Sequence, residues 1–156
     1  SLCALIRDGS FRLPERVAAP HGEHYARRLL HRDERRGYSI IAMTWGGRQG
    51  TALHDHAGLW CVESVWQGSI EVLQFEVVER RDDGLFRFEK CGSMLAGTGS
   101  AGCLIPPHEY HVIRNPEPQP AVSVHIYGGD MDYCNVFESR GDGWYQRRRK
   151  PLSLDE

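Results

Sequence analysis

The chain has 156 residues, which is enough for one domain around a single hydrophobic core, and we expect residues 1–156 to form one unit. Its 40% hydrophobic and 26% charged residues are typical of a soluble globular protein, and the net charge of −2 disfavours a nucleic-acid partner, since phosphate contacts usually require a basic excess. No apolar run approaches the ~20 residues that span a bilayer, and the first eight residues do not resemble a secretory signal, so we expect no membrane partner either.

Helix-forming residues with loosely helical apolar spacing occupy residues 14–31, and a polar turn that ends in Gly37 follows them. From Tyr38 onward, short β-rich runs alternate with glycine and proline turns, a pattern typical of an antiparallel sandwich or small barrel. The predicted runs are Tyr38–Trp45, Leu59–Trp66, Ile70–Arg80, Leu85–Cys91, Gly102–Ile105, Val112–Arg114 and Ala121–Tyr127.

These runs predict an all-β fold with three parts. A short helical N-terminal segment covers residues 14–31, a barrel covers residues 38–137, and a C-terminal tail covers residues 138–156. The tail is expected to add one edge strand or to wrap the barrel. Its basic run at residues 147–150 is interpreted as a solvated surface, because a single short cluster is weak evidence for a nucleic-acid or membrane patch.

The cysteines are odd in number and have no regular spacing, which disfavours a disulfide scaffold and indicates a cytoplasmic protein. They are Cys3, Cys61, Cys91, Cys103 and Cys134.

A His-x-His pair is the strongest local motif of the chain. Residues two apart on a strand point to the same face, so His54 and His56 can present two imidazoles to one metal ion, whereas Asp55 points to the other face. A later block, Pro106 to Asn115, contains a further histidine four residues before its asparagine, which is His111.

Together these two blocks resemble the paired motifs of the cupins, which are jelly-roll β-barrels. The resemblance implies that His111 completes the metal site, with His108 as the alternative ligand, and it places Cys61 where most cupins have a glutamate ligand. The expected site therefore has three neutral histidines. Imidazole suits iron, zinc, copper and nickel, so the ligand type leaves the metal open.

Between Tyr25 and Phe137 the chain also resembles the cysteine dioxygenase family, whose members are iron(II) enzymes of the cupin class. Four separated blocks in the right order carry this resemblance: Tyr25-Ala26-Arg27, Trp45-Gly46 with His54-Asp55-His56 and Cys61, His111 with Asn115, and Pro120-Ala121-Val122-Ser123-Val124-His125-Ile126-Tyr127 with Cys134.

The resemblance implies a role for each matched residue. Arg27 would anchor a substrate carboxylate, a task suited to a planar and permanently charged guanidinium, and Tyr25 would add a hydrogen bond to it. Ser123, His125 and Tyr127 would form a relay in which serine supports histidine and histidine orients the tyrosine hydroxyl. In animal members of the family, the residues equivalent to Cys61 and Tyr127 are joined by a thioether bond, and both residues are present here.

The family implies that Fe(II) is the cofactor and that both atoms of O2 are added to the sulfur of L-cysteine, giving cysteine sulfinic acid. The expected partners are therefore a small thiol and O2, and we expect a monomer or a weak homo-oligomer. After Tyr127 the chain reads Gly128-Gly129-Asp130, where animal enzymes have Ser-Pro-Pro. This departure leaves 3-mercaptopropionate or a related thiol carboxylate as an alternative substrate. A zinc or nickel isomerase or hydrolase and a non-catalytic ligand-binding cupin remain the alternative classes.

Overall fold

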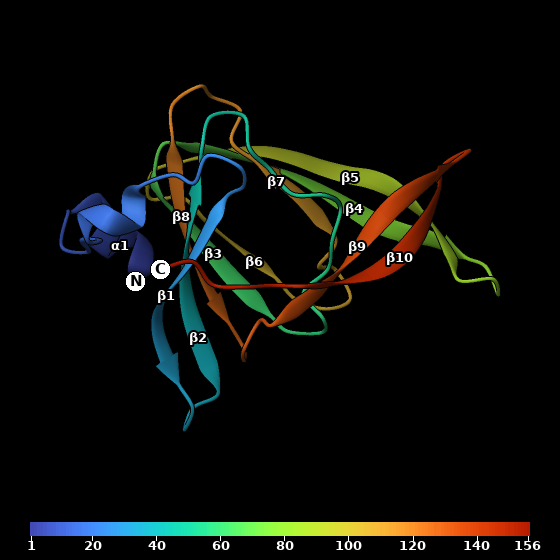
Figure 1. The fold of residues 1–156 in the computed structure, drawn as a ribbon, viewed down its shortest axis with the longest axis horizontal. Helices are drawn as coiled ribbons and strands as arrows, with labels where there is room; N and C mark the ends of the chain where they lie inside the picture. Colours follow the sequence, from blue (N-terminus) through green and yellow to red (C-terminus); the bar gives the residue numbers. More distant parts are fainter.

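Ten strands carry most of the chain in the computed structural model, which describes residues 1–156 (Figure 1). One short helix, α1 (Leu2–Arg7), and a 3-10 turn, η1 (Glu15–Ala18), precede them. The strands are β1 (Ala26–Asp33), β2 (Tyr38–Trp45), β3 (Cys61–Gln67), β4 (Ser69–Arg80), β5 (Leu85–Gly97), β6 (Ala101–Leu104), β7 (His111–Arg114), β8 (Ala121–Tyr127), β9 (Tyr133–Gly141) and β10 (Trp144–Pro151).

The strands form two five-stranded antiparallel sheets, which confirms the predicted all-β fold. The first sheet has the order β1-β2-β8-β3-β6, and the second has the order β7-β4-β5-β10-β9. The main hydrophobic core includes Trp45 and Val65 of the first sheet and Ile70 and Val136 of the second. Side chains on the inner faces of both sheets thus bury the same apolar cluster, as expected where two sheets pack face to face.

An extended segment between β2 and β3 links the two edges of the second sheet. In this segment His54 forms a β-bridge with His111 of β7 on one side and with Val136 of β9 on the other. The backbone N–H groups of His54 and His111 each donate to the other's carbonyl at 3.2 Å, and the N–H of Phe137 donates to the carbonyl of Leu53 at 2.9 Å. The segment therefore pairs with both edge strands, and at this position neither edge strand presents an unpaired backbone.

A second, aromatic cluster lies next to this closure. Phe137 sits at its centre, with ring centroids 5.3 Å from Phe86, 4.8 Å from Phe88 and 5.6 Å from Tyr110 in edge-to-face arrangements. Leu53, from the linking segment, packs into the same cluster. Aromatic burial and edge-to-face contacts thus hold the linking segment against β5 and β9.

The prediction of a helical region over residues 14–31 was wrong in both the extent and the position of the helix. The helix lies at Leu2–Arg7, only the single turn Glu15–Ala18 falls inside the expected range, and Ala26–Asp33 is strand β1. β1 pairs with β2 through a hairpin whose turn contains Gly37 at a φ of +66°. Pairing with β2 outweighs the local helix propensity of these residues, because that propensity amounts to only fractions of a kcal/mol per residue.

The C-terminal residues are also more regular than the expected tail. β9 and β10 form a long hairpin, and β10 pairs with β5 as well as with β9, so it is not an edge strand. After β10 the chain returns across the molecule to β1 (Figure 1), where the N–H of Asp155 donates to the carbonyl of Arg27 at 2.7 Å. The structure contains no helix long and apolar enough to cross a membrane.

Replacing Phe137 with alanine should lower the free energy of unfolding by about 3–5 kcal/mol, because it empties the centre of the aromatic cluster. Urea unfolding followed by fluorescence measures this change. Leu95→Ala is the control, since Leu95 is 65% exposed and its loss should change stability by less than about 0.5 kcal/mol. Equal effects of the two substitutions would contradict this description of the core.

Candidate metal centre

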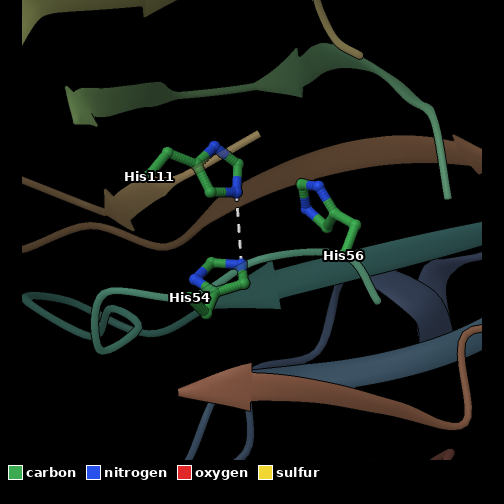
Figure 2. A group of neighbouring side chains, drawn as sticks. All are labelled: His54, His56 and His111. Carbon is green, nitrogen blue, oxygen red and sulfur yellow. Dashed lines mark hydrogen bonds between the residues drawn. The ribbon is translucent and has the colours of Figure 1, made fainter. Parts of the chain in front are cut away.

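His54 and His56 reach the barrel interior from the linking segment. This segment is extended, and the two histidines lie on one side of it (Figure 2). Asp55 lies on the other side, as predicted, where it bonds to Asn135. The carboxylate of Asp55 accepts hydrogen bonds from the backbone N–H of Asn135 at 2.9 Å, from its side-chain amide at 2.8 Å and from the N–H of Ala57 at 3.0 Å. Asp55 is therefore an anchor for the segment and not part of the histidine cluster.

His111 of β7 completes a group of three buried imidazoles. Figure 2 shows the rings of His54, His56 and His111 turned toward one another. The Nε2 atoms of His54 and His111 are 3.2 Å apart, and one potential ligand atom from each residue lies within 4.8 Å of the other two. His108, the alternative ligand, is instead exposed and lies beside Glu76. The structure thus brings His111, and not His108, to the His-x-His pair.

The three imidazoles are prepared to act as neutral ligands. Burial lowers the pKa of His54 and lowers the pKa values of His56 and His111 well below the usual range. The Nδ1 atom of His54 lies 2.9 Å from the carbonyl oxygen of Ala52, which can only accept, so Nδ1 carries the proton and Nε2 is left bare. The Nδ1 atoms of His56 and His111 are buried without a partner. Such a neutral set of convergent nitrogens fits a divalent transition-metal ion.

The cavity beside the histidines has a cationic wall. It is lined by Arg27 and Lys150 together with Tyr25, Met43 and Tyr127. Tyr25 stacks on Trp45 with ring centroids 4.7 Å apart, and burial raises the pKa of its hydroxyl. Two cations and three neutral imidazoles favour an anion in this cavity.

Arg27 is buried, although it lies on strand β1 and not on a helix. Its guanidinium donates hydrogen bonds to the carbonyl oxygens of Ser153 at 2.9 Å and Met131 at 3.1 Å. The carboxylate of Asp155 accepts the backbone N–H of Arg27 at 2.8 Å. The segment that follows β10 therefore holds this arginine against the cavity, a contact that links residues far apart in the sequence.

Lys150 is a cavity residue that the sequence interpretation missed. In the β9–β10 ladder it lies directly opposite Cys134, so both side chains point to the same face, and both line the cavity. The basic run at residues 147–150 is exposed, as expected, and its last member also lines the cavity beside the histidines. The signal that identifies Lys150 is the strand register, which the sequence alone does not provide.

Ser123, His125 and Tyr127 lie on one face of β8, as predicted. The hydroxyl of Ser123 lies 2.8 Å from Nε2 of His125 and accepts a hydrogen bond from the indole N–H of Trp45 at 2.9 Å. The rings of His125 and Tyr127 stack with centroids 5.9 Å apart, and the tyrosine hydroxyl donates to the sulfur of Met43 at 3.9 Å. The serine–histidine part of the expected relay is thus formed, whereas the histidine and tyrosine meet through their ring faces.

Cys61 and Tyr127 lie directly opposite each other where β3 pairs with β8. Both side chains are buried, and burial raises the pKa values of the thiol and of the phenol well above their usual ranges. At the position equivalent to the usual cupin glutamate, the chain thus has an uncharged thiol beside the tyrosine that faces the histidines.

Gly128 explains the departure from the animal sequence after Tyr127. A Cβ atom at this position would lie 2.2 Å from the indole nitrogen of Trp60, and the N–H of Gly128 donates to the carbonyl of Trp60 at 3.0 Å. A side chain at this position, such as that of the matching serine, would collide with the indole. The glycine therefore lets Trp60 cover the end of β8.

Asn115, which follows His111 in the second motif, has a structural role. Its amide donates hydrogen bonds to the carbonyl oxygens of Gln119 at 2.6 Å and Gly46 at 3.2 Å, and its side-chain oxygen accepts from the N–H of Glu117 at 3.0 Å. Asn115 thus fixes the β7–β8 connection and the end of β2, and it makes no contact with the three histidines.

The double antiparallel sheet with its inward-facing histidines defines a cupin. The sequence profile of the family described as cysteine dioxygenase type I matches residues 15–140, so the chain belongs to that family. It is 24% identical over 125 residues to cysteine dioxygenase type 1 of Rattus norvegicus and 26% identical over 125 residues to that of Homo sapiens. Each alignment covers 74% of this chain and 56% of the relative, so the chain spans little more than half the length of these relatives.

Solved structures support the same fold. A protein with a double-stranded β-helix domain from Klebsiella pneumoniae superposes with a TM-score of 0.59 at 14% identity, over 83% of this chain and 97% of that one. At this identity the similarity shows the fold alone.

Replacing His111 with alanine should abolish retention of a divalent transition-metal ion by the desalted protein, because only two of the three imidazoles remain. The loss of affinity should exceed the roughly 10–100-fold that follows loss of a ligand's hydrogen-bond partner. Metal analysis of the desalted protein measures it. His108→Ala is the matched control and should retain as much metal as the unmodified chain. Loss of metal from the His108 variant, with retention by the His111 variant, would reverse the ligand assignment.

Proposed function

We propose that the protein is an iron(II)-dependent thiol dioxygenase that adds both atoms of O2 to the sulfur of L-cysteine, giving cysteine sulfinic acid. Membership of the cysteine dioxygenase type I family is the observation that carries this proposal. The reaction converts R–SH and O2 into R–SO2H, so atoms and electrons balance without an external reductant. Bound iron would supply open coordination positions and the capacity to activate O2, and His54, His56 and His111 would hold it.

The cationic wall supports a thiol that carries a carboxylate. Two of the N–H groups of Arg27 already bind backbone carbonyls, which fixes the guanidinium plane beside the cavity. Its remaining donors can bind a carboxylate, Lys150 adds a second positive charge, and the hydroxyl of Tyr25 can donate a hydrogen bond to the same group. These contacts would orient the substrate with its sulfur toward the histidines.

Tyr127 and His125 would control protons beside the substrate. Burial raises the pKa of Tyr127, so its hydroxyl stays protonated and can donate to an oxygen or sulfur atom in the cavity. Burial also lowers the pKa of His125 to about 3, so the imidazole is neutral, and its bond to Ser123 restrains the ring. The chain would thus offer a neutral donor at the reaction site and would keep further positive charge away from it.

A thioether bond between Cys61 and Tyr127 also belongs to this proposal. Their direct opposition across β3 and β8 supports it. Its formation would join sulfur to a ring carbon and release two protons and two electrons, which O2 can accept. We further propose a cytoplasmic protein, in keeping with five cysteines in the thiol form, and a monomer or weak homo-oligomer.

O2 consumption by the iron-loaded full chain tests the proposal, with L-cysteine, 3-mercaptopropionate and cysteamine compared in parallel and the products analysed by mass. We expect L-cysteine to gain two oxygen atoms. Arg27→Ala should lower kcat/KM for L-cysteine by about 10–100-fold, which corresponds to the loss of a charged hydrogen-bonded pair of roughly 1.5–3 kcal/mol. Cysteamine, which has no carboxylate, should be turned over at the same low rate by both proteins.

The same experiment separates the alternatives. Turnover of 3-mercaptopropionate alone would retain the thiol dioxygenase class and contradict the proposed substrate. The absence of O2 uptake with all three thiols, in protein that retains iron, would contradict the class and favour a hydrolase, an isomerase or a binding protein.

A further inference from the structure

A second group of potential metal ligands contains none of the three histidines and consists of Cys61, Glu63 and His125. Cys61 and Glu63 come from β3, and His125 comes from β8 directly opposite Glu63. The sulfur of Cys61 is 3.8 Å from Nδ1 of His125, and a carboxylate oxygen of Glu63 is 3.6 Å from the same nitrogen. One ligand atom from each residue lies within 4.8 Å of the other two.

The hydrogen bonds of this group leave its inner atoms available. His125 uses Nε2 for its contact with Ser123, so Nδ1 is the atom that faces the group. The Oε2 atom of Glu63 is buried and has no hydrogen-bond partner. A buried carboxylate oxygen without a partner is costly, and burial raises the pKa of Glu63 to about 7. The cost is removed when a proton or a metal ion binds there.

A separate cavity adjoins the group. Glu63 and His125 line a cavity between the two sheets that is also lined by Ser64, Ser100 and Gly102. None of His54, His56 and His111 contributes to this cavity, whereas His125 lines both cavities. The cavity that Glu63 lines is therefore distinct from the cavity beside the three histidines.

We propose that Cys61, Glu63 and His125 form a second divalent-metal site with a preference for zinc. Donors about 2.0–2.3 Å from one tetrahedral ion lie roughly 3.3–3.6 Å apart, so small side-chain movements would close the observed spacing around an ion. A thiolate and a carboxylate together neutralise a doubly charged ion, which makes its burial far less costly than at a neutral site. The proton of the Cys61 thiol, and that of Glu63 when protonated, would be released to solvent on binding.

An ion at this site would act on the proposed dioxygenase as an inhibitor. It would occupy Nδ1 of His125 and the sulfur of Cys61, and so prevent the thioether bond with Tyr127 and fix the imidazole beside the substrate cavity. This consequence depends on the proposed function, whereas the binding of the ion does not.

Cobalt(II) titration of the metal-free full chain tests the site, with protein produced without added iron and confirmed by mass to lack the thioether. Cobalt bound to a thiolate gives an intense sulfur-to-metal absorption band that an all-histidine site does not give. We expect two equivalents of cobalt to bind, with this band present. Cys61→Ser should abolish the band, Glu63→Gln should weaken binding at this site by about tenfold or more, and His111→Ala should retain the band.

Cys134→Ser is the matched control, because Cys134 is a buried thiol that lines the other cavity. This variant should keep the band. A single equivalent of cobalt, or a band that survives Cys61→Ser and disappears with Cys134→Ser, would overturn the proposal. Circular dichroism of each variant verifies that the fold is retained.

Zinc inhibition of the iron-loaded protein tests the consequence. Zinc should lower O2 uptake in the unmodified chain, and Glu63→Gln should shift the required zinc concentration upward by about tenfold, each protein being compared with its own zinc-free rate. If the cobalt band behaves as expected but no thiol supports O2 uptake even without zinc, the second site stands and the proposed function fails. If zinc inhibits both proteins equally, the inhibitory role is wrong.

Discussion

The two-sided backbone pairing of His54 is the contact on which the metal centre depends. His54 pairs with His111 of β7 on one side and with Val136 of β9 on the other, so one residue fixes the distance between two strands that are not neighbours in the sheet. The bonds from Asn135 to Asp55 hold the next residue of the same segment. Because the backbone positions both His54 and His111, their side chains meet without requiring a flexible loop to close.

Charge distinguishes the three-histidine group from the group formed by Cys61, Glu63 and His125. The three-histidine centre is neutral, and Arg27 and Lys150 line the cavity beside it. An anionic ligand bound in that cavity would offset the positive charge of a metal ion and of these two side chains. The second group has two acidic side chains, Cys61 and Glu63, which would neutralise a divalent ion by themselves once both had lost their protons. Only the three-histidine centre leaves positive charge that can attract a thiol carboxylate. We therefore propose that the thiol is oxidised at that centre.

Strands with continuous apolar sequence were predictable to the residue, as Tyr38–Trp45 and Ala121–Tyr127 show. Strand β10 was not, because its side chains are mostly charged. It is held by contacts that depend on register, such as the ion pair of Arg148 with Glu138 and the stacking of Arg149 on Tyr133. The histidine ligands could be identified from local motifs, whereas the cavity position of Lys150 and the burial of Glu63 follow from pairing between strands. Local motifs and the family resemblance therefore predicted the three histidines and Arg27, but not the places of Lys150 and Glu63.

X-ray absorption at the iron edge of the Fe(II)-loaded chain, with and without L-cysteine under anaerobic conditions, tests the central claim most directly. We predict only nitrogen and oxygen neighbours for the iron without substrate, since three histidines hold it, and one added sulfur neighbour when L-cysteine binds. In protein loaded with less than one equivalent of iron, a sulfur neighbour before any thiol is added would show that the iron prefers a site with a cysteine ligand to the three histidines. No sulfur neighbour after its addition would show that the substrate does not bind the metal, and either result would contradict the account.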